Sequence, residues 1–496
     1  MLDFIINNTN DFISNVSKSH RKKLGQFFTS RETAEYMASI VNKKNKKIRI
    51  LDPGAGSGIL TGALIDKLQT VNEITDIHVD LYENDLDIIP LLKSNLDYIK
   101  KNTKKKFTYN LIEENFIVRN EKVNNKESNQ NKGIYDVVIC NPPYKKINKD
   151  SIEAKIMSNV IYGQPNLYFL FMALSIRLMK RNAEMIFIVP RSWTSGAYFK
   201  KFRKFFLKET KITNMHLFES RKKVFDSEKV LQEAMIIKAI KSNKEPNEIE
   251  ITTSTDNNIF ENIRYYLVEY DLCVEKNENN YIYLPTSEDD INVLKTINPL
   301  NIKLTDLGLK LKTGRTVDFR VKQLLFSDYK SGLVPLITSS HFKEGIIEFP
   351  STKVDMQYIS KANQSLLQKN TNYLLLKRFS SKEEPRRLQP ALFLKEYYNE
   401  YEFISTENHI NYFCSILKND VEDDLLYGLY AIYNSTLYDK YYRILNGSTQ
   451  VNATEINAIP IPNEKSITNM GKKLREYDNI STKVCDDILK EEWIYV

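Results

Sequence analysis

Residues 51–58 read LDPGAGSG, and this stretch decides the fold class. Asp52 closes an apolar, β-rich run, and Gly54, Gly56 and Gly58 follow it at alternate positions. Glycine permits a tight turn and lets the backbone approach a ligand closely, so a strand followed by this turn is typical of nucleotide sites in α/β proteins. A purely structural turn would leave the same pattern, so the neighbouring segments have to discriminate between the two.

Short β-rich runs alternate with helical patterns around this turn, over residues 48–240. Such alternation predicts βαβ units around a parallel sheet. The expected strands are IRILDPG (48–54), DIHVDLYEND (76–85), YDVVIC (135–140) and AEMIFIVP (183–190), and the expected buried helix is LYFLFMALSIRLMK (167–180). The first half of the chain is therefore expected to form one α/β domain.

The second expected strand ends in LYEND (81–85), about 25 to 30 residues after the glycines. An acid at that position can accept hydrogen bonds from both ribose hydroxyls of an adenosine. Glu83 is the predicted acceptor, and Asp85 is its substitute. Because no Gly-Lys-Ser/Thr follows the glycines, the predicted ligand is an adenosine without a phosphate chain.

The tetrapeptide NPPY (141–144) ends the third expected strand, because proline cannot donate to the next ladder hydrogen bonds. Pro142 favours extended backbone at Asn141 and leaves the Asn141 side chain at the strand's carboxyl end, where open α/β sheets bind ligands. The Asn141 side-chain oxygen and the Pro142 carbonyl can accept both hydrogens of an exocyclic amino group, while Tyr144 offers a stacking face. This geometry would turn the amine's lone pair toward an electrophile without a strong base. The alternative is a Pro-Pro loop that only ends a strand.

Length and composition limit the classes of protein to which the chain can belong. A length of 496 residues favours two or three domains, and no apolar run approaches the roughly 18 to 20 residues of a membrane span. With a polar N-terminus and no signal peptide, the expected location is the cytoplasm. Four separated cysteines and five scattered histidines predict neither disulfides nor a metal site. The net charge of +8, from 71 Lys and Arg against 63 Asp and Glu, fits a polyanionic partner if the excess clusters.

Two polar stretches, 120–133 and 241–250, are expected to be loops, and the second marks a boundary. We therefore expect a catalytic domain at 1–245, a connecting segment at 246–300 and a further domain at 301–496. This last domain is rich in Tyr, Phe, Lys and Arg and shows no repeat, so its internal fold is not readable from the pattern.

Taken in order, these motifs resemble the gamma-class DNA adenine-N6 methyltransferases of type II restriction-modification systems, the Eco57I- and BsuBI/PstI-like methylases. The resemblance covers most of the chain. Besides the glycine turn, the acid and NPPY, it rests on KLGQFFTSRETAEYM (23–37), PRSWTSGAYFKKFRKF (190–205), HLFESRKKVFDSEKVLQEAMII (216–237) and NGSTQVNATEINAIPIP (446–462). It implies an α/β, Rossmann-like class I S-adenosylmethionine-dependent methyltransferase domain followed by a mixed α/β target-recognition domain. The implied reaction transfers a methyl group from S-adenosyl-L-methionine to N6 of a flipped adenine in double-stranded DNA.

Carried over residue by residue, the resemblance implies a cofactor site around the glycine turn. Thr29 would help to hold the methionine part of the cofactor, although a threonine or serine before RETAEYM could also cap a helix. Asn115 stands where the family has an Asp, and its amide oxygen can still accept from the adenine amino group. The alternative is an asparagine that only serves a turn at the end of a strand. The implied cofactor-binding residues are Gln26, Phe27, Thr29, Asp52, Gly54, Ala55, Gly56, Gly58, Glu83, Asn84, Asn115, Phe116 and Asn141.

The resemblance also implies which residues act on the target base. Tyr144 and Phe225 would stack on opposite faces of the flipped adenine. Methyl transfer would be direct, without a covalent intermediate, and Cys140 is expected in the core. The implied catalytic residues are Asn141, Pro142, Pro143, Tyr144 and Phe225.

Recognition of DNA is expected from three segments, 311–319, 376–390 and 441–452, where basic side chains can meet phosphates and others can read base edges. The expected DNA contacts are Arg315, Lys377, Arg378, Arg386 and Arg387. The runs RF (378–379), KEEPRR (382–387) and GSTQVNATE (447–455) resemble those of a subgroup whose partner nuclease cuts CTGCAG. A cognate restriction endonuclease is expected as a separate polypeptide, and the methyltransferase itself is expected to be a monomer.

Two alternatives stay open. NPPY after a glycine turn also occurs in methyltransferases that modify RNA guanine N2 or a protein glutamine, and these usually lack a long recognition domain. A DNA-specificity or architectural protein with an inactive methyltransferase domain is the non-enzymatic alternative, which the intact NPPY disfavours. Cofactor binding, and methyl incorporation into DNA, RNA or protein, would separate these classes.

Overall fold

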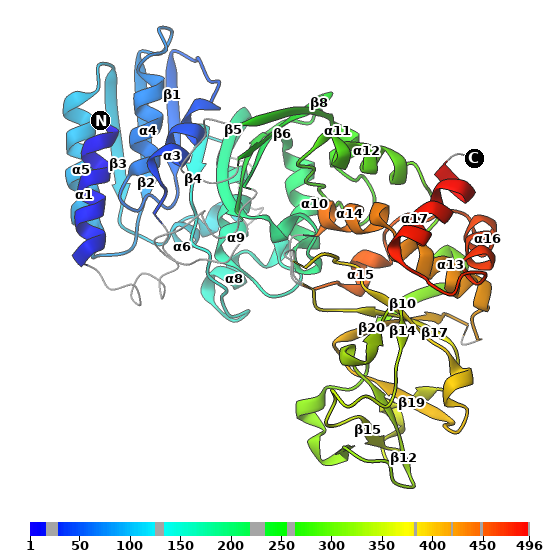
Figure 1. Cartoon of the computed structure of the whole chain (residues 1–496). Coiled ribbons are helices and arrows are strands. Elements are labelled where there is room, and N and C mark those ends of the chain that lie inside the picture. The colour runs from blue at the N-terminus through cyan, green and yellow to red at the C-terminus, as the bar shows by residue number, and fades with distance from the viewer. Residues whose placement is uncertain are drawn as a thin grey trace. The chain divides into compact units, whose positions relative to one another are not determined.

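The computed structural model describes residues 1–15, 28–124, 133–218, 234–254, 263–380, 384–417, 420–446 and 450–494. The chain divides into two compact units, Met1–Glu288 and Asp289–Val496 (Figure 1). No helix among these described residues combines the length and the apolar character needed to cross a membrane.

The first unit is built on a nine-stranded sheet with the order β3-β2-β1-β4-β5-β7-β6-β8-β9. Neighbouring strands from β3 to β5 all pair in parallel, so their carboxyl ends share one edge. The predicted α/β fold with βαβ units is therefore confirmed. The strands are β1 (Lys47–Asp52), β2 (Asp76–Tyr82), β3 (Lys106–Ile112), β4 (Tyr135–Cys140), β5 (Met179–Pro190), β6 (Lys211–Phe218), β7 (Ala234–Ile240), β8 (Glu248–Ser254) and β9 (Arg264–Glu269).

The helices of this unit form two groups around the sheet. Because the chain runs from β1 outward to β3 and then returns to β4, right-handed crossovers place α4 and α5 on one face and α9 on the other. The expected buried helix is confirmed as α9, which ends at Leu178, because β5 already begins at Met179. The helices are α1 (Leu2–Asn15), α3 (Arg31–Ser39), α4 (Ile59–Leu68), α5 (Ile89–Asn102), α6 (Phe116–Arg119), α7 (Glu121–Asn124), α8 (Ile152–Ile156), α9 (Leu167–Leu178), α10 (Lys200–Glu209) and α11 (Tyr270–Cys273).

The segment 246–300 differs from the connection expected there. Strands β8 and β9 complete the large sheet, and the boundary between the two units falls at Glu288. The buried side chains of β8 are partly polar. Thr252 and Ser254 form hydrogen bonds with the two ring nitrogens of buried His216 at 2.9 and 3.0 Å. Burial lowers the pKa of His216 to about 3, so this histidine is neutral inside the sheet.

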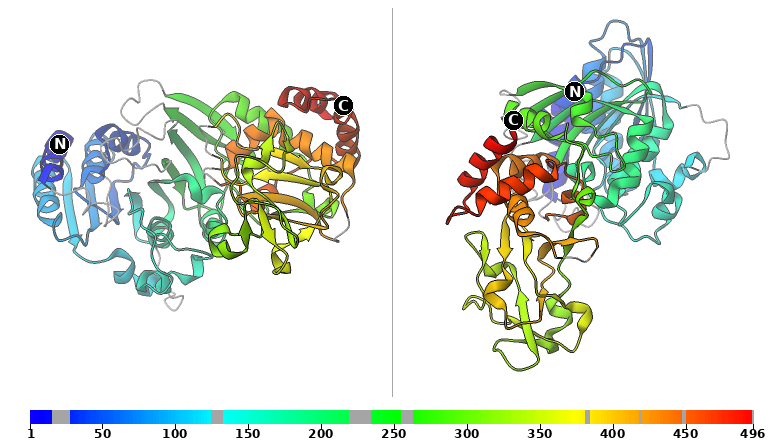
Figure 2. Two further views of the ribbon diagram at one scale, coloured as in Figure 1. Left: turned by 60° about the horizontal axis from the view of Figure 1, so that its bottom comes forward. Right: turned by 90° about the vertical axis from the view of Figure 1, so that its right-hand side faces the viewer.

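The second unit contains two smaller sheets and a group of helices, so a mixed α/β composition is observed. In Figures 1 and 2 the helices after residue 420, coloured orange to red, gather on one side of the yellow and green strands. One sheet has the order β10-β20-β17-β18-β14-β13 and the other β11-β15-β12-β19-β16. The strands are β10 (Leu309–Thr313), β11 (Leu325–Phe326), β12 (Leu333–Ile337), β13 (Phe342–Lys343), β14 (Ile346–Ile347), β15 (Tyr358–Ser360), β16 (Gln368–Lys369), β17 (Tyr373–Lys377), β18 (Pro390–Phe393), β19 (Phe403–Thr406) and β20 (Ile410–Ser415). The helices are α12 (Glu288–Ile297), which spans the boundary, α13 (Asp423–Tyr433), α14 (Thr436–Leu445), α15 (Ala453–Ile456), α16 (Glu464–Leu474) and α17 (Thr482–Leu489).

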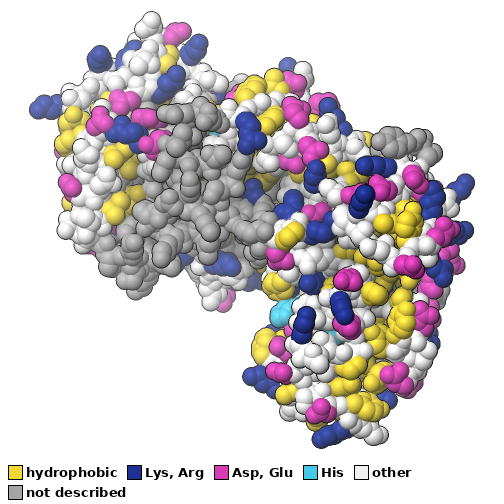
Figure 3. Space-filling model, viewed as in Figure 1, with side chains coloured by type: hydrophobic (Ala, Val, Ile, Leu, Met, Phe, Trp, Pro, Cys, Tyr) yellow, Lys and Arg dark blue, Asp and Glu magenta, His cyan; other side chains and the backbone are white. Residues whose placement is uncertain are grey.

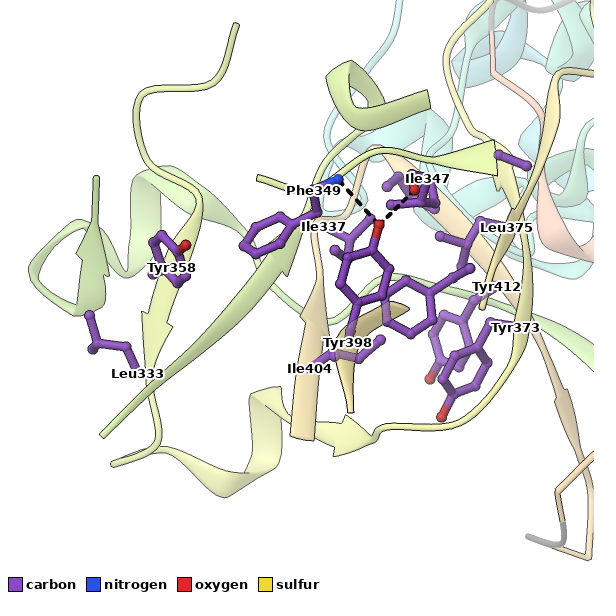
Figure 4. Packing of buried hydrophobic residues seen from close by; sticks show 13 residues of the cluster. Leu333, Ile337, Ile347, Phe349, Tyr358, Tyr373, Leu375, Tyr398, Ile404 and Tyr412 are labelled. Carbon is purple, nitrogen blue, oxygen red and sulfur yellow. Dashed lines mark hydrogen bonds between the residues drawn. The ribbon is translucent and has the colours of Figure 1, made fainter. Parts of the chain in front are cut away.

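An aromatic and aliphatic core lies among the strands of the second unit (Figure 4). Tyr398 is central to it: its hydroxyl donates to the Ile347 carbonyl at 2.7 Å and accepts from the Phe349 amide at 3.2 Å. Its ring stacks on Phe393 with centroids 4.9 Å apart. A buried tyrosine with both hydroxyl roles satisfied contributes apolar area without leaving a polar group unpaired.

Candidate active site

A pocket of the first unit lies where the strand order reverses. The chain leaves β1 for β2 and β3 on one side and later places β4 on the other, and open α/β sheets bind ligands in the crevice at such a point. A pocket of about 270 Å³ occupies this crevice. The carboxyl ends of four neighbouring strands line it, with the glycine turn after β1, Glu83 after β2, Asn115 after β3 and Asn141 after β4.

The glycine turn has the backbone that the sequence predicts. Gly56 and Gly58 have φ angles of +53° and +85°, which lie in the left-handed region that favours glycine. The Ala55 amide donates to the Tyr82 carbonyl at 3.0 Å, and the Gly58 amide donates to the Ala55 carbonyl at 2.8 Å. Around the position of an added Cβ on Gly56, no atom of the other described residues stands within 4 Å, its two chain neighbours aside. The turn is thus fixed to β2 and open at its apex.

Asp52 ends β1 beneath this turn and is fully buried. Its Oδ2 accepts a hydrogen bond from Thr61 Oγ1 at 2.8 Å, which ties the end of β1 to α4. Burial raises the pKa of Asp52 from 3.8 to about 7, and the charge of Glu83 adds to the shift, while donors from Thr61 and Gly54 oppose it. The turn is therefore built over a carboxyl group that titrates near neutral pH.

Glu83 joins the turn to the end of β2. Its Oε2 accepts from the Gly56 amide at 2.9 Å, and its Oε1 accepts from the amides of Asn84 and Asp85 at 2.8 and 2.9 Å. Burial raises the pKa of Glu83, and these three donors lower it. The carboxylate is held in one orientation at the pocket wall, while Asn84, beside it in the lining, is exposed.

Asn115 and Phe116 form the next wall, after β3. Asn115 is the N-cap of α6, and its Oδ1 accepts from the amides of Ile117 and Val118 at 3.0 and 3.2 Å. Its Nδ2 donates to Glu153 Oε1 at 2.9 Å. Phe116 is buried and meets Tyr82 edge-on with ring centroids 5.0 Å apart. The amide oxygen expected to meet a ligand is thus engaged in a helix cap.

Asn141 reaches the pocket from the end of β4. Its Nδ2 donates to Thr29 Oγ1 at 3.2 Å, which brings together two motifs that lie 112 residues apart in the chain. The helix cap that the sequence also allowed here is provided by Ser30, whose side chain accepts from the Thr33 amide. Pro143 lines the pocket, whereas Pro142 is buried.

Tyr144 does not line the pocket in this structure. It is 8% exposed, its hydroxyl donates to the Ile188 carbonyl at 2.9 Å, and its ring meets Tyr168 edge-on at 6.2 Å. Burial raises its pKa well above the usual value. Cys140 is fully buried, as expected for a core residue. Three further predicted site residues, Gln26, Phe27 and Phe225, lie outside the described residues.

The pocket also contains residues that the sequence did not single out. Lys145 follows NPPY directly, and Phe171 belongs to the predicted buried helix, so both lie next to a recognised feature. Glu153 lies on α8, a five-residue helix in a segment without any motif, and only the folded chain brings it to Asn115.

The five basic residues expected to contact DNA have unequal surroundings. Arg315 is exposed, and its guanidinium donates to the Leu367 carbonyl at 2.6 Å, while Lys377 and Arg378 are half-buried. Arg386 donates to the Ser435 carbonyl at 3.0 Å, and Arg387 is only 1% exposed. On the face seen in Figure 3, basic and acidic side chains of the second unit are interspersed. Arg387 therefore belongs to the core, because its side chain reaches little solvent.

Comparison with known proteins shows which family the chain belongs to. The chain is 34% identical to the type II methyltransferase M.BsuBI of Bacillus subtilis, over 95% of this chain and 94% of that one. It is 32% identical to the type II methyltransferase M.PstI of Providencia stuartii, over 96% and 94% of the two chains. The model of the Eco57I restriction-modification methylase family matches residues 63–225.

The chain belongs to the type II methyltransferases of restriction-modification systems. The resemblance inferred from the motifs is therefore confirmed, and so is the S-adenosylmethionine-dependent class of enzyme. The fold of this type II methyltransferase is shared with the type IIL restriction-modification enzyme MmeI, solved in complex with DNA. That structure matches with a TM-score of 0.55 and 12% identity, over 100% of this chain and 74% of MmeI.

Proposed function

We propose that this methyltransferase transfers a methyl group from S-adenosyl-L-methionine to N6 of an adenine flipped out of double-stranded DNA. The observation that carries the proposal is the single pocket in which the glycine turn, Glu83 and Asn141 meet at adjoining strand ends. The proposed role is the modification half of a type II system, with the restriction endonuclease on a separate polypeptide and a monomeric methyltransferase in the bacterial cytoplasm.

The pocket residues fit S-adenosyl-L-methionine. The open apex at Gly56 lets the backbone approach the amino-acid part of the cofactor, and the two Glu83 oxygens can accept from its ribose hydroxyls. Phe171 and Ile88 supply apolar lining for the purine ring. The bound cofactor would supply an electrophilic methyl group on a positively charged sulfur.

Asn141 is proposed to hold the target amine. Because its Nδ2 donates to Thr29, its Oδ1 is oriented as the acceptor end of the amide. Oδ1 and the Pro142 carbonyl would take the two hydrogens of adenine N6 and direct the nitrogen lone pair at the methyl group. The N–C bond then forms as the S–C bond breaks, and the surplus proton passes to solvent. Tyr144, anchored to Ile188, and Phe225 are proposed to stack on the flipped base.

The second unit is proposed as the target-recognition domain, with Arg315, Lys377 and Arg378 as contacts to DNA phosphates. Arg386 and Arg387 are not included, because the first donates to helix carbonyls and the second is buried. CTGCAG is the target expected from the resemblance, and the experiment that tests the function also identifies the target.

The test is incubation of methylation-free DNA with the purified protein and S-adenosyl-L-methionine, followed by sequencing of the modified bases. We expect N6-methyladenine at one short motif. Asn141→Ala should lower the rate at least about a hundredfold, because it removes a preorganised acceptor. Asn42→Ala, an exposed asparagine outside the pocket, is the matched control. Cofactor binding without DNA methylation would instead direct attention to RNA or protein glutamine as substrate.

A further inference from the structure

The order of the strands fixes the order of the parts of a bound cofactor. The sheet places β4, β1, β2 and β3 side by side, and the pocket runs along all four carboxyl ends. If Glu83 after β2 holds the ribose and the reacting methyl lies toward Asn141 after β4, the purine must extend the other way, toward the end of β3. The residues there are Asn115, Phe116 and Glu153.

Asn115 has no acceptor directed to this purine position. Its only side-chain oxygen already accepts the two amides at the start of α6, at 3.0 and 3.2 Å. Removing such an N-cap interaction destabilises a helix, so a ligand would have to compete with the helix. The remaining polar atom, Nδ2, is a donor and would repel the donor amino group of an adenine.

Glu153 has the acceptor that Asn115 lacks. Its Oε1 is held by Asn115 Nδ2 at 2.9 Å, and α8, which carries it, contacts α6 (Figure 1). Its side chain is half-buried in the pocket lining, and within the described part of the chain its Oε2 forms no hydrogen bond. A carboxylate fixed through one oxygen is an acceptor with little orientational freedom left to lose.

We infer that Glu153, oriented by Asn115, accepts the hydrogen bond from the amino group of the cofactor's adenine and makes the site selective for adenosine. The inference rests on the proposed cofactor site. Asn115 then acts as a positioning residue: it caps α6 with its oxygen and directs the carboxylate with its nitrogen. The acid that the family resemblance places at position 115 is thus replaced by an acid from α8.

The test compares two ligands that differ at the purine 6-position, S-adenosyl-L-homocysteine and S-inosyl-L-homocysteine. The first offers an amino donor there and the second a carbonyl acceptor, which a carboxylate would repel. Calorimetric titration of the full-length protein should show at least about tenfold tighter binding of the adenosine ligand, as expected for one charge-assisted hydrogen bond. Glu153→Gln can still accept from Asn115 while it presents an amide donor to the purine, so the preference should fall about tenfold or reverse.

Two further variants make the result specific. Glu121→Gln, an exposed acid on α7, should leave the preference unchanged. Glu114→Gln alters the other acid beside Asn115 in the pocket lining. A preference that changes in Glu114→Gln, or that stays the same in Glu153→Gln while S-adenosyl-L-homocysteine still binds, would overturn the inference and leave the proposed function intact. If the wild-type protein bound neither ligand, the proposed cofactor site and this inference would both be wrong.

Discussion

Two asparagines in the pocket show how the same side chain takes different roles according to its backbone position. Asn141 follows a strand and precedes Pro142, and this placement at a strand end was predictable from NPPY. Asn115 precedes a helix, and its oxygen is used as the cap. The sequence identified both positions but not this difference, because the short helix α6 has too few residues to show a periodic pattern.

At Asp52 the raised pKa predicts a pH-dependent stability. The folded-state pKa of about 7 exceeds the ordinary 3.8, so folding takes up a proton between these values, and the free energy of unfolding falls as pH rises through this window. Asp52→Asn stays neutral, so it should lose this dependence and be more stable than the wild type at pH 8, by roughly 1 to 3 kcal/mol. Chemical denaturation from pH 5 to 8 measures both. Asp11→Asn, at an exposed position, is the control and should keep the pH dependence of the wild type. If Asp52→Asn also kept that dependence, the assignment of the raised pKa to Asp52 would be contradicted.

Because the Glu83 carboxylate accepts three backbone amides, replacing it with glutamine should weaken cofactor binding in two ways. Glu83→Gln presents an NH₂ group to at least one of the donors now served by the carboxylate, and it removes the charge that would strengthen hydrogen bonds from a ribose. We expect S-adenosyl-L-homocysteine to bind at least about tenfold more weakly in calorimetry. Glu113→Gln, which alters a surface ion pair with Lys93, should bind normally. Equal affinities in both variants would place the ribose elsewhere.

At the scale of the elements, a pair of glycine substitutions can separate the role of the glycine turn in ligand binding from the effect of backbone strain. Gly56→Ala puts a side chain on a residue with φ of +53°, and Gly308→Ala does the same at +67° in the second unit. Chain neighbours aside, no atom of the described residues lies within 4 Å of either new Cβ. Each should lower the free energy of unfolding by about 1 kcal/mol. Only Gly56→Ala should also weaken S-adenosyl-L-homocysteine binding, because only its methyl group would enter the pocket. A matching loss of affinity in Gly308→Ala would show that strain alone explains the effect.

The elements that the sequence predicted are those whose hydrophobic pattern is simple. Strand β4 and the later part of β5 are apolar runs, β1 and β2 alternate apolar with polar residues, and α9 is apolar on nearly every side. Strand β8, EIEITTS, was missed because its buried positions include two threonines and a serine; of these, Thr252 and Ser254 form hydrogen bonds with His216 inside the sheet. The small strands of the second unit, several only two residues long, are too short for any periodicity to appear.

The position of the boundary between the two units determines which fragment of the whole molecule contains a complete sheet. A fragment that ends at residue 245, the end predicted from the sequence, would lack β8 and β9 and would expose the edge of β6 together with the cavity left by Ile249, Ile251 and Val268, which are at most 2% exposed. A fragment of residues 1–288 keeps the complete sheet and the pocket.

We therefore expect the 1–288 fragment to unfold cooperatively and to be stabilised by S-adenosyl-L-homocysteine, with a melting temperature that rises with ligand concentration. The 1–245 fragment should aggregate or melt without a cooperative transition. Neither fragment should methylate DNA site-specifically, because the proposed recognition unit is absent from both. Thermal melts with and without ligand, followed by the methylation assay, give the answer. Site-specific methylation by residues 1–288 would contradict the assignment of target recognition to the second unit, while a cooperative, ligand-stabilised 1–245 fragment would show that β8 and β9 are dispensable.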